Sequence, residues 1–577
     1  MPRLTLKHVQ YILFSPFFNV RIYLNYVQHS LSLSVRIHRR DGQVPYITPL
    51  DPLRFLLRSA MVYANKTAII HRHRSFTFWE LSERIRALAN VLLTKYHVRP
   101  GDRVAILCQN ISAFIEAQYA IPAISGVTVP INTRLSAKEV EYLLEHSGAT
   151  VLIIQTEFTD KLTDEVRALN YLKIIEVADS EDIHSDFYEK LLADESKNSR
   201  QLSWNDMPTC QDENQMLSIN YTSGSTGRPK GVIVTYRGAY MMALGMVIQD
   251  KLTPDTKFLW TLPMFHCNGW SFPWAIVAVG GTQITLNKLD YTQVWQMLKN
   301  EGITHYNGAP TVNNEICNHT DAVRLDNPIH VLSGGSALSS TLIKQMTSLN
   351  LIPTQVYGLT ETYGPAVLTY DYHTRRQYTE EEQYKLLARP GYNIITSDEI
   401  RVLDAETATD VEPNGMQIGE ICFTGNVVMK GYYNNIEETK KIFRNGVLWT
   451  GDLAVRHPDG SIEIVDRSKD VIVSGGENIS SIEVENVIVQ LDAILECAIV
   501  SEPDDKWGER PVAYIVLKKD KSVDKQSIIE HCRRNLAGYK CPSKIVFTET
   551  LPRTSTGKVQ KYLLRNALWK KYKKRIN

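Results

Sequence analysis

Hydrophobic and polar positions after residue 45 alternate between a helical and an extended period. Over 76–95 the apolar residues recur at intervals of three and four, which predicts an amphipathic helix. The apolar runs 103–108 and 151–155 predict buried strands, and a further helix is expected over 160–169. Repeated strand–helix units predict parallel sheets with helices packed on their faces, so the expected fold class is α/β.

Two segments break this rhythm. The stretch 179–216 is polar and weakly patterned, which predicts a surface excursion. A boundary is expected near residue 469, where the turn Pro458-Asp459-Gly460 and the strand 462–465 give way to a run of 108 residues, 470–577. That run has its own strands and helices and is long enough to form a small independent domain.

Composition narrows the class of protein. The chain has 577 residues, 43% of them hydrophobic, so it can build a large core. Its 64 basic and 63 acidic residues nearly cancel, which removes the basic footprint expected of a nucleic-acid-binding protein. The eight cysteines show no zinc spacing, so we expect reduced thiols, no disulfide and no structural metal.

The first 45 residues have a composition of their own. Basic residues and serines occur there, but no acidic residue precedes Asp41. This pattern is typical of an organelle transit peptide, and the alternative is an unstructured or mispredicted extension. The apolar run 9–20 contains Pro16 and is shorter than the ~20 residues of a spanning helix, so no transmembrane segment is expected. Mitochondrial location is the prediction, with peroxisome or cytosol as alternatives; the last residues, 575–577, do not spell the Ser-Lys-Leu peroxisomal signal.

The segment 221–231 has the composition of a phosphate-binding loop. It offers hydroxyls, glycines and a lysine in the order Thr222, Ser223, Gly224, Ser225, Thr226, Gly227 and Lys230. Glycines let backbone N–H groups approach an anion, hydroxyls donate hydrogen bonds and lysine supplies charge. The spacing is not that of a Walker A loop, and the alternative is a flexible Ser/Gly turn.

Three later motifs carry further candidate chemistry. Tyr357-Gly358-Leu359-Thr360-Glu361 combines an aromatic ring with a hydroxyl and a carboxylate, and a carboxylate oxygen suits Mg²⁺. The Asp452 carboxylate can accept hydrogen bonds from both hydroxyls of a ribose. Arg467 can hold that carboxylate in place, because its guanidinium is a rigid fork of donors. The third motif is the segment 552–561, which contains Lys558. The alternative interpretation is that the lysines and arginines of this region form a solvated basic tail without a role in chemistry.

The sequence resembles the adenylate-forming enzymes, which include acyl-CoA synthetases, hydroxycinnamate–CoA ligases, peptide-synthetase adenylation domains and beetle luciferases. The resemblance covers about residues 46–570 and is carried by the motifs above. The strings 263–270 and 474–481 are most similar to the acyl-activating branch that handles short, medium or aromatic acids. The resemblance implies a large N-terminal domain of stacked α/β sheets with a small β-barrel-like subdomain over 46–468, and a small mobile α+β domain over 469–577.

The resemblance also implies residue roles. Lys558, Thr222, Glu361 and His266 are expected to act in catalysis, with Thr222 and Glu361 near Mg²⁺. Lys469 is the expected hinge. The expected binding set for ATP and coenzyme A is Thr222, Ser223, Gly224, Ser225, Thr226, Gly227, Lys230, Gly335, Ser336, Tyr357, Gly358, Thr360, Asp452, Arg467, Lys469, Gly475, Gly476, Glu477 and Lys558.

The acid pocket is the least defined part of the site. Its walls are expected at 266–270, 307–311 and 333–337, and Trp260, Trp270 and Trp274 indicate a bulky lining or, alternatively, core packing. Butyrate-like, medium-chain and benzoate-like acids all stay open.

The predicted activity is an AMP-forming acid–thiol ligase that joins a carboxylic acid to coenzyme A through an acyl-adenylate. A luciferase-like oxidoreductase and a non-enzymatic nucleotide-binding protein are the alternatives.

Overall fold

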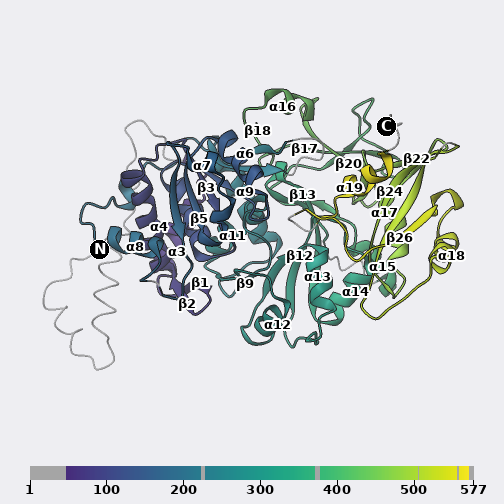
Figure 1. The fold of residues 1–577 in the computed structure, drawn as a ribbon, viewed down its shortest axis with the longest axis horizontal. Helices are drawn as coiled ribbons and strands as arrows, with labels where there is room; N and C mark the ends of the chain where they lie inside the picture. The colour runs from purple at the N-terminus through teal and green to yellow at the C-terminus, as the bar shows by residue number, and fades with distance from the viewer. Residues whose placement is uncertain are drawn as a thin grey trace.

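The computed structural model describes residues 47–182, 184–222, 228–370, 377–504, 506–554 and 558–570. The predicted leader 1–45 and the loop residues Ser223, Gly224, Ser225, Thr226 and Gly227 lie outside these ranges. In Figure 1 the described chain runs from the purple and blue elements on the left to the yellow elements on the right.

The first large sheet has seven strands in the order β18-β8-β7-β4-β3-β5-β6. Its strands are β3 (Arg103–Leu107), β4 (Val127–Pro130), β5 (Ala149–Gln155), β6 (Lys173–Val177), β7 (Met216–Thr222), β8 (Lys230–Thr235) and β18 (Gly431–Tyr432). The strands from β7 to β6 are parallel, and β8 and β18 are antiparallel to their neighbours. The predicted parallel sheet is therefore confirmed.

Helices cover this sheet where the sequence periodicity places them. The predicted helix 76–95 is α4 (Phe78–Asn90) followed by a π-helical turn (Val91–Lys95). A reciprocal capping box between Thr77 and Glu80 starts α4 because each side chain satisfies a free backbone N–H of the other. The same device starts α6 (Ala137–Ser147) at Ser136, and Gly148, with φ of 61°, ends it. The fully buried α5 (Ser112–Ala123) lies on the same sheet.

The second large sheet has nine strands in the order β15-β14-β13-β12-β11-β9-β10-β1-β2. Its strands are β1 (Thr67–His71), β2 (Arg74–Thr77), β9 (Lys257–Trp260), β10 (Thr282–Thr285), β11 (His305–Gly308), β12 (Ile329–Ser333), β13 (Leu351–Leu359), β14 (Gly364–Leu368) and β15 (Tyr392–Asn393). The helices along this half are α3 (Leu53–Val62), α9 (Tyr236–Gln249), α11 (Phe272–Val279), α12 (Tyr291–Asn300), α13 (Pro310–Cys317), α14 (Ser340–Ser348) and α15 (Glu380–Leu387). One continuous apolar core, which includes residues of α4, α5, α9 and α11, joins the two sheets.

A third, antiparallel sheet holds the end of the predicted N-terminal domain. It consists of β16 (Arg401–Leu403), β17 (Ile418–Phe423), β19 (Phe443–Arg444), β20 (Val447–Arg456) and β21 (Ile462–Arg467), with α16 (Ile436–Ile442) before β19. In the β20–β21 hairpin Asp452 lies directly opposite Arg467. Two predicted site residues are thus neighbours by strand register.

The C-terminal region forms a separate small sheet with its own core, on the right of Figure 1. It contains β22 (Ile472–Ser474), β23 (Glu477–Ile479), β24 (Ile494–Asp504), β25 (Gly508–Leu517) and β26 (Lys544–Phe547), and the helices α17 (Ser481–Ile488), α18 (Lys525–Asn535) and α19 (Lys561–Trp569). The sheet is mainly antiparallel, with only the β25–β26 pair parallel. This agrees with the expected α+β class.

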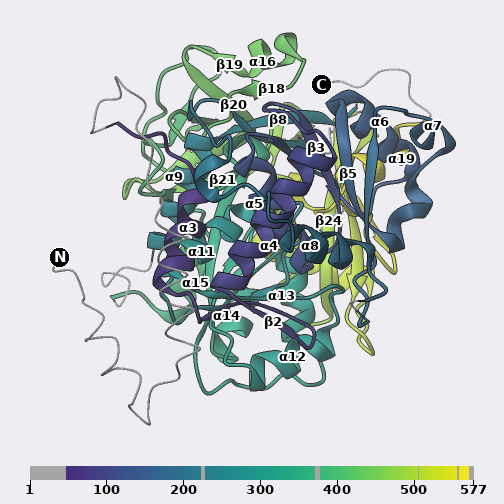
Figure 2. The same ribbon diagram turned by 90° about the vertical axis from the view of Figure 1, so that its left-hand side faces the viewer.

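Two expectations about local structure are wrong. The segment 160–169 is not one helix: a 3-10 helix (Thr156–Lys161) stops at the extended Leu162, and Thr163 caps the short α7 (Asp164–Arg167). The segment 179–216 is not only a surface excursion, because it contains α8 (Phe187–Ser196), which packs on α4 through buried Tyr188, Leu191 and Leu192. Figure 2 shows α8 beside α4.

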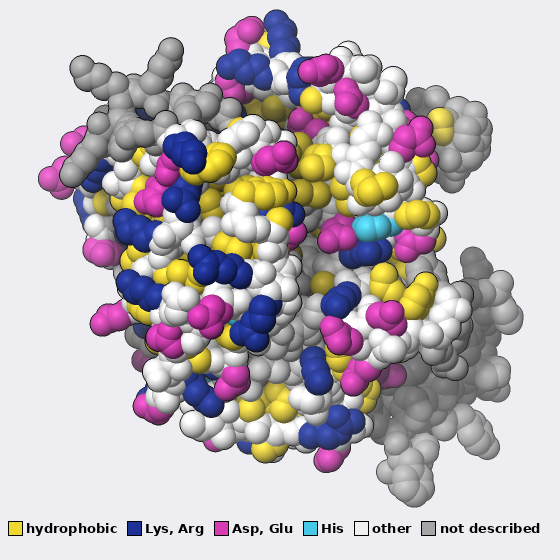
Figure 3. All heavy atoms as spheres, turned by 90° about the vertical axis from the view of Figure 1, so that its right-hand side faces the viewer, with side chains coloured by type: hydrophobic (Ala, Val, Ile, Leu, Met, Phe, Trp, Pro, Cys, Tyr) yellow, Lys and Arg dark blue, Asp and Glu magenta, His cyan; other side chains and the backbone are white. Residues whose placement is uncertain are grey.

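Charged side chains of both signs are mixed on the surface near the C-terminal region (Figure 3). Figure 3 faces the right-hand side of Figure 1 and shows lysine and arginine interspersed with acidic side chains. Among the described residues, no helix combines the length and apolar character needed to cross a bilayer.

Candidate functional site

A cavity of about 1370 Å³ lies where the three sheets meet the C-terminal region. Its walls come from the ends of β7 and β13, from the β20–β21 hairpin and from the segment before α19. Most predicted site residues that the structure describes line it: Thr222, Lys230, His266, Gly335, Ser336, Tyr357, Gly358, Thr360, Glu361, Asp452, Arg467, Lys469 and Lys558. Motifs separated by hundreds of residues therefore share one cavity.

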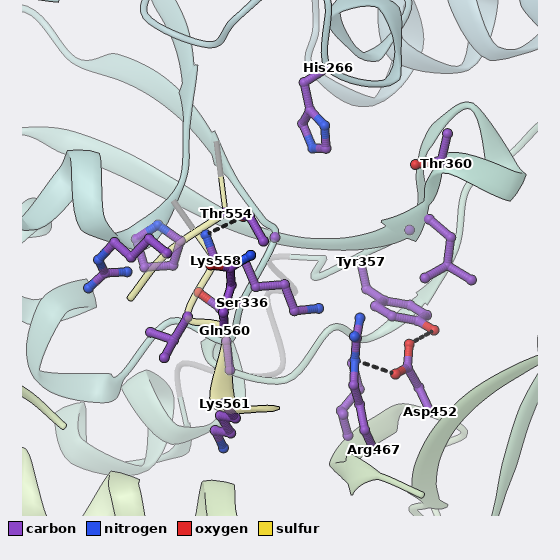
Figure 4. A pocket seen from close by; sticks show the side chains of 18 of the residues that line it. His266, Ser336, Tyr357, Thr360, Asp452, Arg467, Thr554, Lys558, Gln560 and Lys561 are labelled. Atoms are coloured by element: carbon purple, nitrogen blue, oxygen red, sulfur yellow. Dashed lines mark hydrogen bonds and ion pairs between the residues drawn. The ribbon is translucent and has the colours of Figure 1, made fainter. Parts of the chain in front are cut away.

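Asp452 connects two other predicted residues. Its Oδ2 accepts a hydrogen bond of 2.8 Å from the Tyr357 hydroxyl, and its Oδ1 lies 3.1 Å from Nε of Arg467. Asp452 is buried, and burial followed by the Asp452 carboxylate raises the pKa of Tyr357 well above its usual value. Figure 4 shows this group on one side of the cavity. A tyrosine ring beside a fixed carboxylate–guanidinium pair is suited to a planar base and a sugar diol.

Thr360 and Glu361 lie in a single 3-10 turn (Thr360–Thr362) that directly follows β13. The Glu361 carboxylate accepts a 2.7 Å hydrogen bond from the Tyr432 hydroxyl. The Thr360 hydroxyl lies 3.4 Å from Sγ of Cys267, whose pKa burial raises to about 12. This turn presents an oxygen-rich edge to the cavity, and Cys267 is a neutral thiol there.

Lys230 faces the same edge from β8. Its ammonium pairs with Glu438 and lies 5.0 Å from the centre of the Tyr432 ring. The hydrogen bond from Lys230 is the main reason that the pKa of Glu438 lies well below its usual value. An anion entering the cavity would thus meet a lysine that is already held in place.

The donors near Glu361 suit a magnesium ion that is held mainly by its substrate. Among the described residues there is no group of three or more His, Cys, Asp or Glu that could enclose a metal. Mg²⁺ commonly uses one or two carboxylates together with water and phosphate oxygens. The Glu361 carboxylate and the Thr222 hydroxyl, at the end of β7, fit this donor chemistry.

Lys558 enters the cavity from the C-terminal region, as Figure 4 shows. Its backbone N–H donates to Oγ1 of Thr554 at 3.1 Å. Burial, and secondarily the Arg467 guanidinium, lowers the pKa of Lys558 to about 7. Burial, followed by the charge of Lys558, lowers the pKa of His266 to about 4, so this imidazole is neutral at ordinary pH.

The helix after Lys558 is held by partly buried ion pairs that the sequence did not predict. Nζ of Lys561 lies 2.6 Å from both Oε1 of Glu485 and Oγ of Ser481. Nη1 of Arg565 donates to the Lys469 carbonyl at 3.0 Å and to Asp470 at 2.6 Å. The tail is therefore tied to the backbone of the predicted hinge residue. No spacing rule identifies such partners, because the chain separations exceed 75 residues.

The glycine hairpin lies elsewhere. Gly475 and Gly476 form the turn between β22 and β23, and Glu477 begins β23. All three are exposed, and none of the three lines the cavity. In this arrangement the tail lysine faces the site and the hairpin does not.

The predicted acid walls are partly corrected. Thr311 and the exposed backbone of Gly335 and Ser336 line the cavity. Trp260 and Trp274 are fully buried and do not line it, so of the three tryptophans only Trp270 reaches the cavity. Tyr432 and Glu438 also line the cavity and were not predicted; the string Gly431-Tyr432-Tyr433 was the only sequence signal for them.

Comparison of the whole chain with known proteins gives two matching family models and several similar enzymes. Residues 56–433 match the family described as AMP-binding enzyme, and residues 483–558 match the AMP-binding enzyme C-terminal domain. An acetate/butyrate–CoA ligase of Arabidopsis thaliana, described as peroxisomal, is 38% identical over 90% of this chain and 94% of its own. A peroxisomal benzoate–CoA ligase of the same plant is 36% identical, covering 90% of this chain and 93% of its own.

A solved structure extends the comparison. The o-succinylbenzoate CoA synthetase from Bacillus subtilis, in complex with the acyl-adenylate intermediate OSB-AMP, superimposes with a TM-score of 0.74 at 27% identity. The match covers 88% of this chain and 97% of that one. The mixed α/β fold expected from the sequence is thereby confirmed.

Proposed function

Since the chain belongs to the AMP-binding enzyme family, we propose that its cavity joins a carboxylic acid to coenzyme A with conversion of ATP to AMP and diphosphate. The observation that carries this proposal is the convergence of Lys558 with the Tyr357–Asp452–Arg467 group around one cavity. The relatives named above are CoA ligases, so neither a luciferase-like oxidation nor a non-enzymatic role is favoured.

The nucleotide is proposed to bind between β13 and the β20–β21 hairpin. The Tyr357 ring would pack against the adenine, and the Asp452 carboxylate would accept from the ribose hydroxyls while Arg467 holds it in position. Thr360, Lys230 and Thr222 would contact the phosphates, and these assignments rest on the shared cavity and on the hydrogen bonds of Asp452. The same role for 223–227 rests on the sequence motif alone.

Adenylation needs the acid carboxylate to attack the α-phosphate, although both groups are negative. A charged Lys558 between them would lower this repulsion and align the attack, while neutral His266 lines the approach. Mg²⁺, held by Glu361 and Thr222, would supply positive charge to the phosphate oxygens. The products are acyl-AMP and diphosphate.

Thioester formation is proposed to follow a domain rotation. Residues 46–468 and 469–577 would move as two bodies about Lys469, withdrawing Lys558 and bringing Gly475, Gly476 and Glu477 toward the cavity. The coenzyme A thiol would then displace AMP from the acyl-adenylate. The separate core of the C-terminal sheet supports a boundary at this position.

The test is a comparison of half-reactions in Lys558→Ala. Pyrophosphate release from acid plus ATP should fall by ~10²–10³, the range seen when one preorganised electrostatic donor is removed. Thioester formation from synthetic acyl-AMP should be largely kept. Lys570→Ala is the matched control, because Lys570 is an exposed lysine of the same tail outside the cavity. Equal loss of both half-reactions would disprove the division of labour.

The cell compartment is a separate proposal. The basic leader predicts an organelle, and the two relatives named above are called peroxisomal, which favours the peroxisome; the mitochondrial prediction has no support from them. A fluorescent fusion of the whole chain that colocalises with a mitochondrial rather than a peroxisomal marker would reverse this choice.

A further inference from the structure

The segment that follows His266 has an unusual backbone. Five consecutive residues have positive φ: Cys267 (37°), Asn268 (44°), Gly269 (65°), Trp270 (54°) and Ser271 (67°). Only one of them is glycine; asparagine tolerates a left-handed conformation, but this conformation costs the other three residues ~1–2 kcal/mol each. Such strain persists only where the surroundings dictate the conformation, and it clusters at functional sites.

Buried hydrogen bonds hold this left-handed segment from behind. The Asn268 amide donates to Oε1 of Gln118 at 3.2 Å and accepts from the Tyr363 hydroxyl at 3.1 Å. The Tyr363 hydroxyl in turn accepts from Nε1 of Trp274 at 3.2 Å. All four side chains are at most 1% exposed, and none lines the cavity. These hydrogen bonds fix the segment from the protein interior, although Nε2 of Gln118 has no partner among the described residues.

The left-handed segment delivers Trp270 to the end of the cavity. A Cβ built on Gly334, just after β12, would lie 3.3 Å from Cη2 of the Trp270 indole. A Cβ built on Gly364 would lie 3.2 Å from the Cα of Trp270. The indole thus reaches from its own segment to the end of β12, and the lack of side chains at both glycines gives it room. Trp270 is 5% exposed and still lines the cavity. Its side chain is therefore packed almost entirely against protein, and we call it the floor of the cavity.

The wall next to this floor is apolar. Val356 and Pro365 line the cavity beside Trp270, and Val356 packs against the same Gly334. The thiol of Cys267 is neutral because burial raises its pKa. A second carboxylate or a polar head group packed against Val356 and Pro365 would lose water and gain no hydrogen bond from these two side chains, which is unfavourable.

We propose that Trp270 closes the acid end of the cavity and that the substrate is a short aliphatic monocarboxylic acid. This inference rests on the proposed ligase function. An acid whose carboxylate lies near Lys558 would direct its alkyl chain toward the indole, so each added methylene soon meets the floor. Medium-chain and aromatic acids would clash with Trp270, whose strained and hydrogen-bonded backbone cannot easily move.

The experiment compares acetate, butyrate, octanoate and benzoate with ATP and coenzyme A, measuring AMP formation by wild type and Trp270→Ala. Wild type should give its highest kcat/KM with acetate or butyrate. Trp270→Ala should raise the octanoate-to-butyrate ratio of kcat/KM at least ~10-fold, since each methylene accommodated is worth about fourfold. An unchanged ratio in the folded variant would overturn the inference.

Controls separate the possible failures. Trp270→Phe removes less volume and should raise the octanoate-to-butyrate ratio of kcat/KM by a smaller factor. If Trp270→Ala does not fold, an unchanged ratio in Trp270→Phe would overturn the inference. Trp295→Phe, which alters a buried tryptophan in another core, should leave the ratio unchanged. Wild-type preference for octanoate or benzoate would overturn the substrate class alone, whereas no acid-dependent AMP at all would overturn the ligase function.

Discussion

The charge of Lys558 gives the sharpest test of the proposed adenylation step. Burial and the nearby Arg467 lower its pKa to about 7, so in the free enzyme this lysine loses its charge as the pH rises through neutrality. A neutral amine cannot reduce the repulsion between carboxylate and phosphate. Adenylation should therefore weaken on the alkaline side of pH 7, where an ordinary lysine would stay charged.

The size of the effect follows from that pKa. About 90% of Lys558 is charged at pH 6, half at pH 7 and about 10% at pH 8. The value of kcat/KM for ATP reports the free enzyme, so it should fall about tenfold per unit above pH ~7.5. The profile of kcat reports the bound complex, and bound phosphates favour the charged lysine; its decline should begin at higher pH.

The assay is pyrophosphate release between about pH 6 and 9, with the acid held at a fixed concentration well below its KM so that ATP meets the free enzyme. Lys558→Arg is the control, because a guanidinium stays charged across this range and should lack the alkaline decline. His266 is neutral throughout, since its pKa is about 4. Thioester formation from acyl-AMP should show no such decline. An alkaline decline of the same midpoint in Lys558→Arg would refute the reasoning.

Three further changes have defined outcomes. Asp452→Asn should raise the KM for ATP ~10–100-fold, because the charged hydrogen bond between the buried Asp452 and the half-buried Arg467 is lost; an unchanged KM contradicts this. Glu361→Gln should raise the half-saturating Mg²⁺ concentration ~10-fold or more with little effect on the KM for the acid, as titration would reveal. Thr77→Ala removes the capping box with Glu80 and should lower the unfolding free energy by ~1 kcal/mol while activity at 25 °C is kept; an unshifted denaturant midpoint would count against it.

Part of the site follows from the sequence by simple geometry. A turn at 458–460 between two strands predicts a hairpin in which equal counting from the turn places Asp452 opposite Asp466, one residue from Arg467. A register shift between Leu453 and Ala454 moves the pairing by one residue, so that Asp452 lies opposite Arg467. The parallel sheets likewise follow from alternating periods, as β3 and β5 illustrate. Local pattern thus predicts which strands pair, whereas the exact pairing of Asp452 with Arg467 depends on the register shift.

Contacts between separate sheets do not follow in this way. The Tyr357–Asp452 hydrogen bond joins β13 to β20 across 95 residues, and only the resemblance suggested that the two act together. The helix α8 was missed because just three of its residues are buried within a polar segment. The left-handed segment after His266 was also unpredictable, since four of its five residues normally avoid that conformation.

The lowered pKa of Lys558 also bears on what drives the proposed rotation. Near the predicted hinge the Ser480 hydroxyl donates to the Val465 carbonyl and the Ser481 N–H to Asp466, both at 2.6 Å, in addition to the backbone hydrogen bonds from Asp470 and Val471 to the Arg467 carbonyl. Breaking such bonds costs ~1 kcal/mol each, a small barrier. Burial beside Arg467 disfavours a charged Lys558, so the lysine remains in the cavity most stably while phosphate anions are there. In the proposed cycle, the departure of diphosphate would remove part of that stabilisation, since the phosphate of acyl-AMP stays behind, and water would favour the ammonium. Release of diphosphate would therefore weaken the arrangement in which Lys558 occupies the cavity, just before the proposed attack of the thiol requires the rotated arrangement.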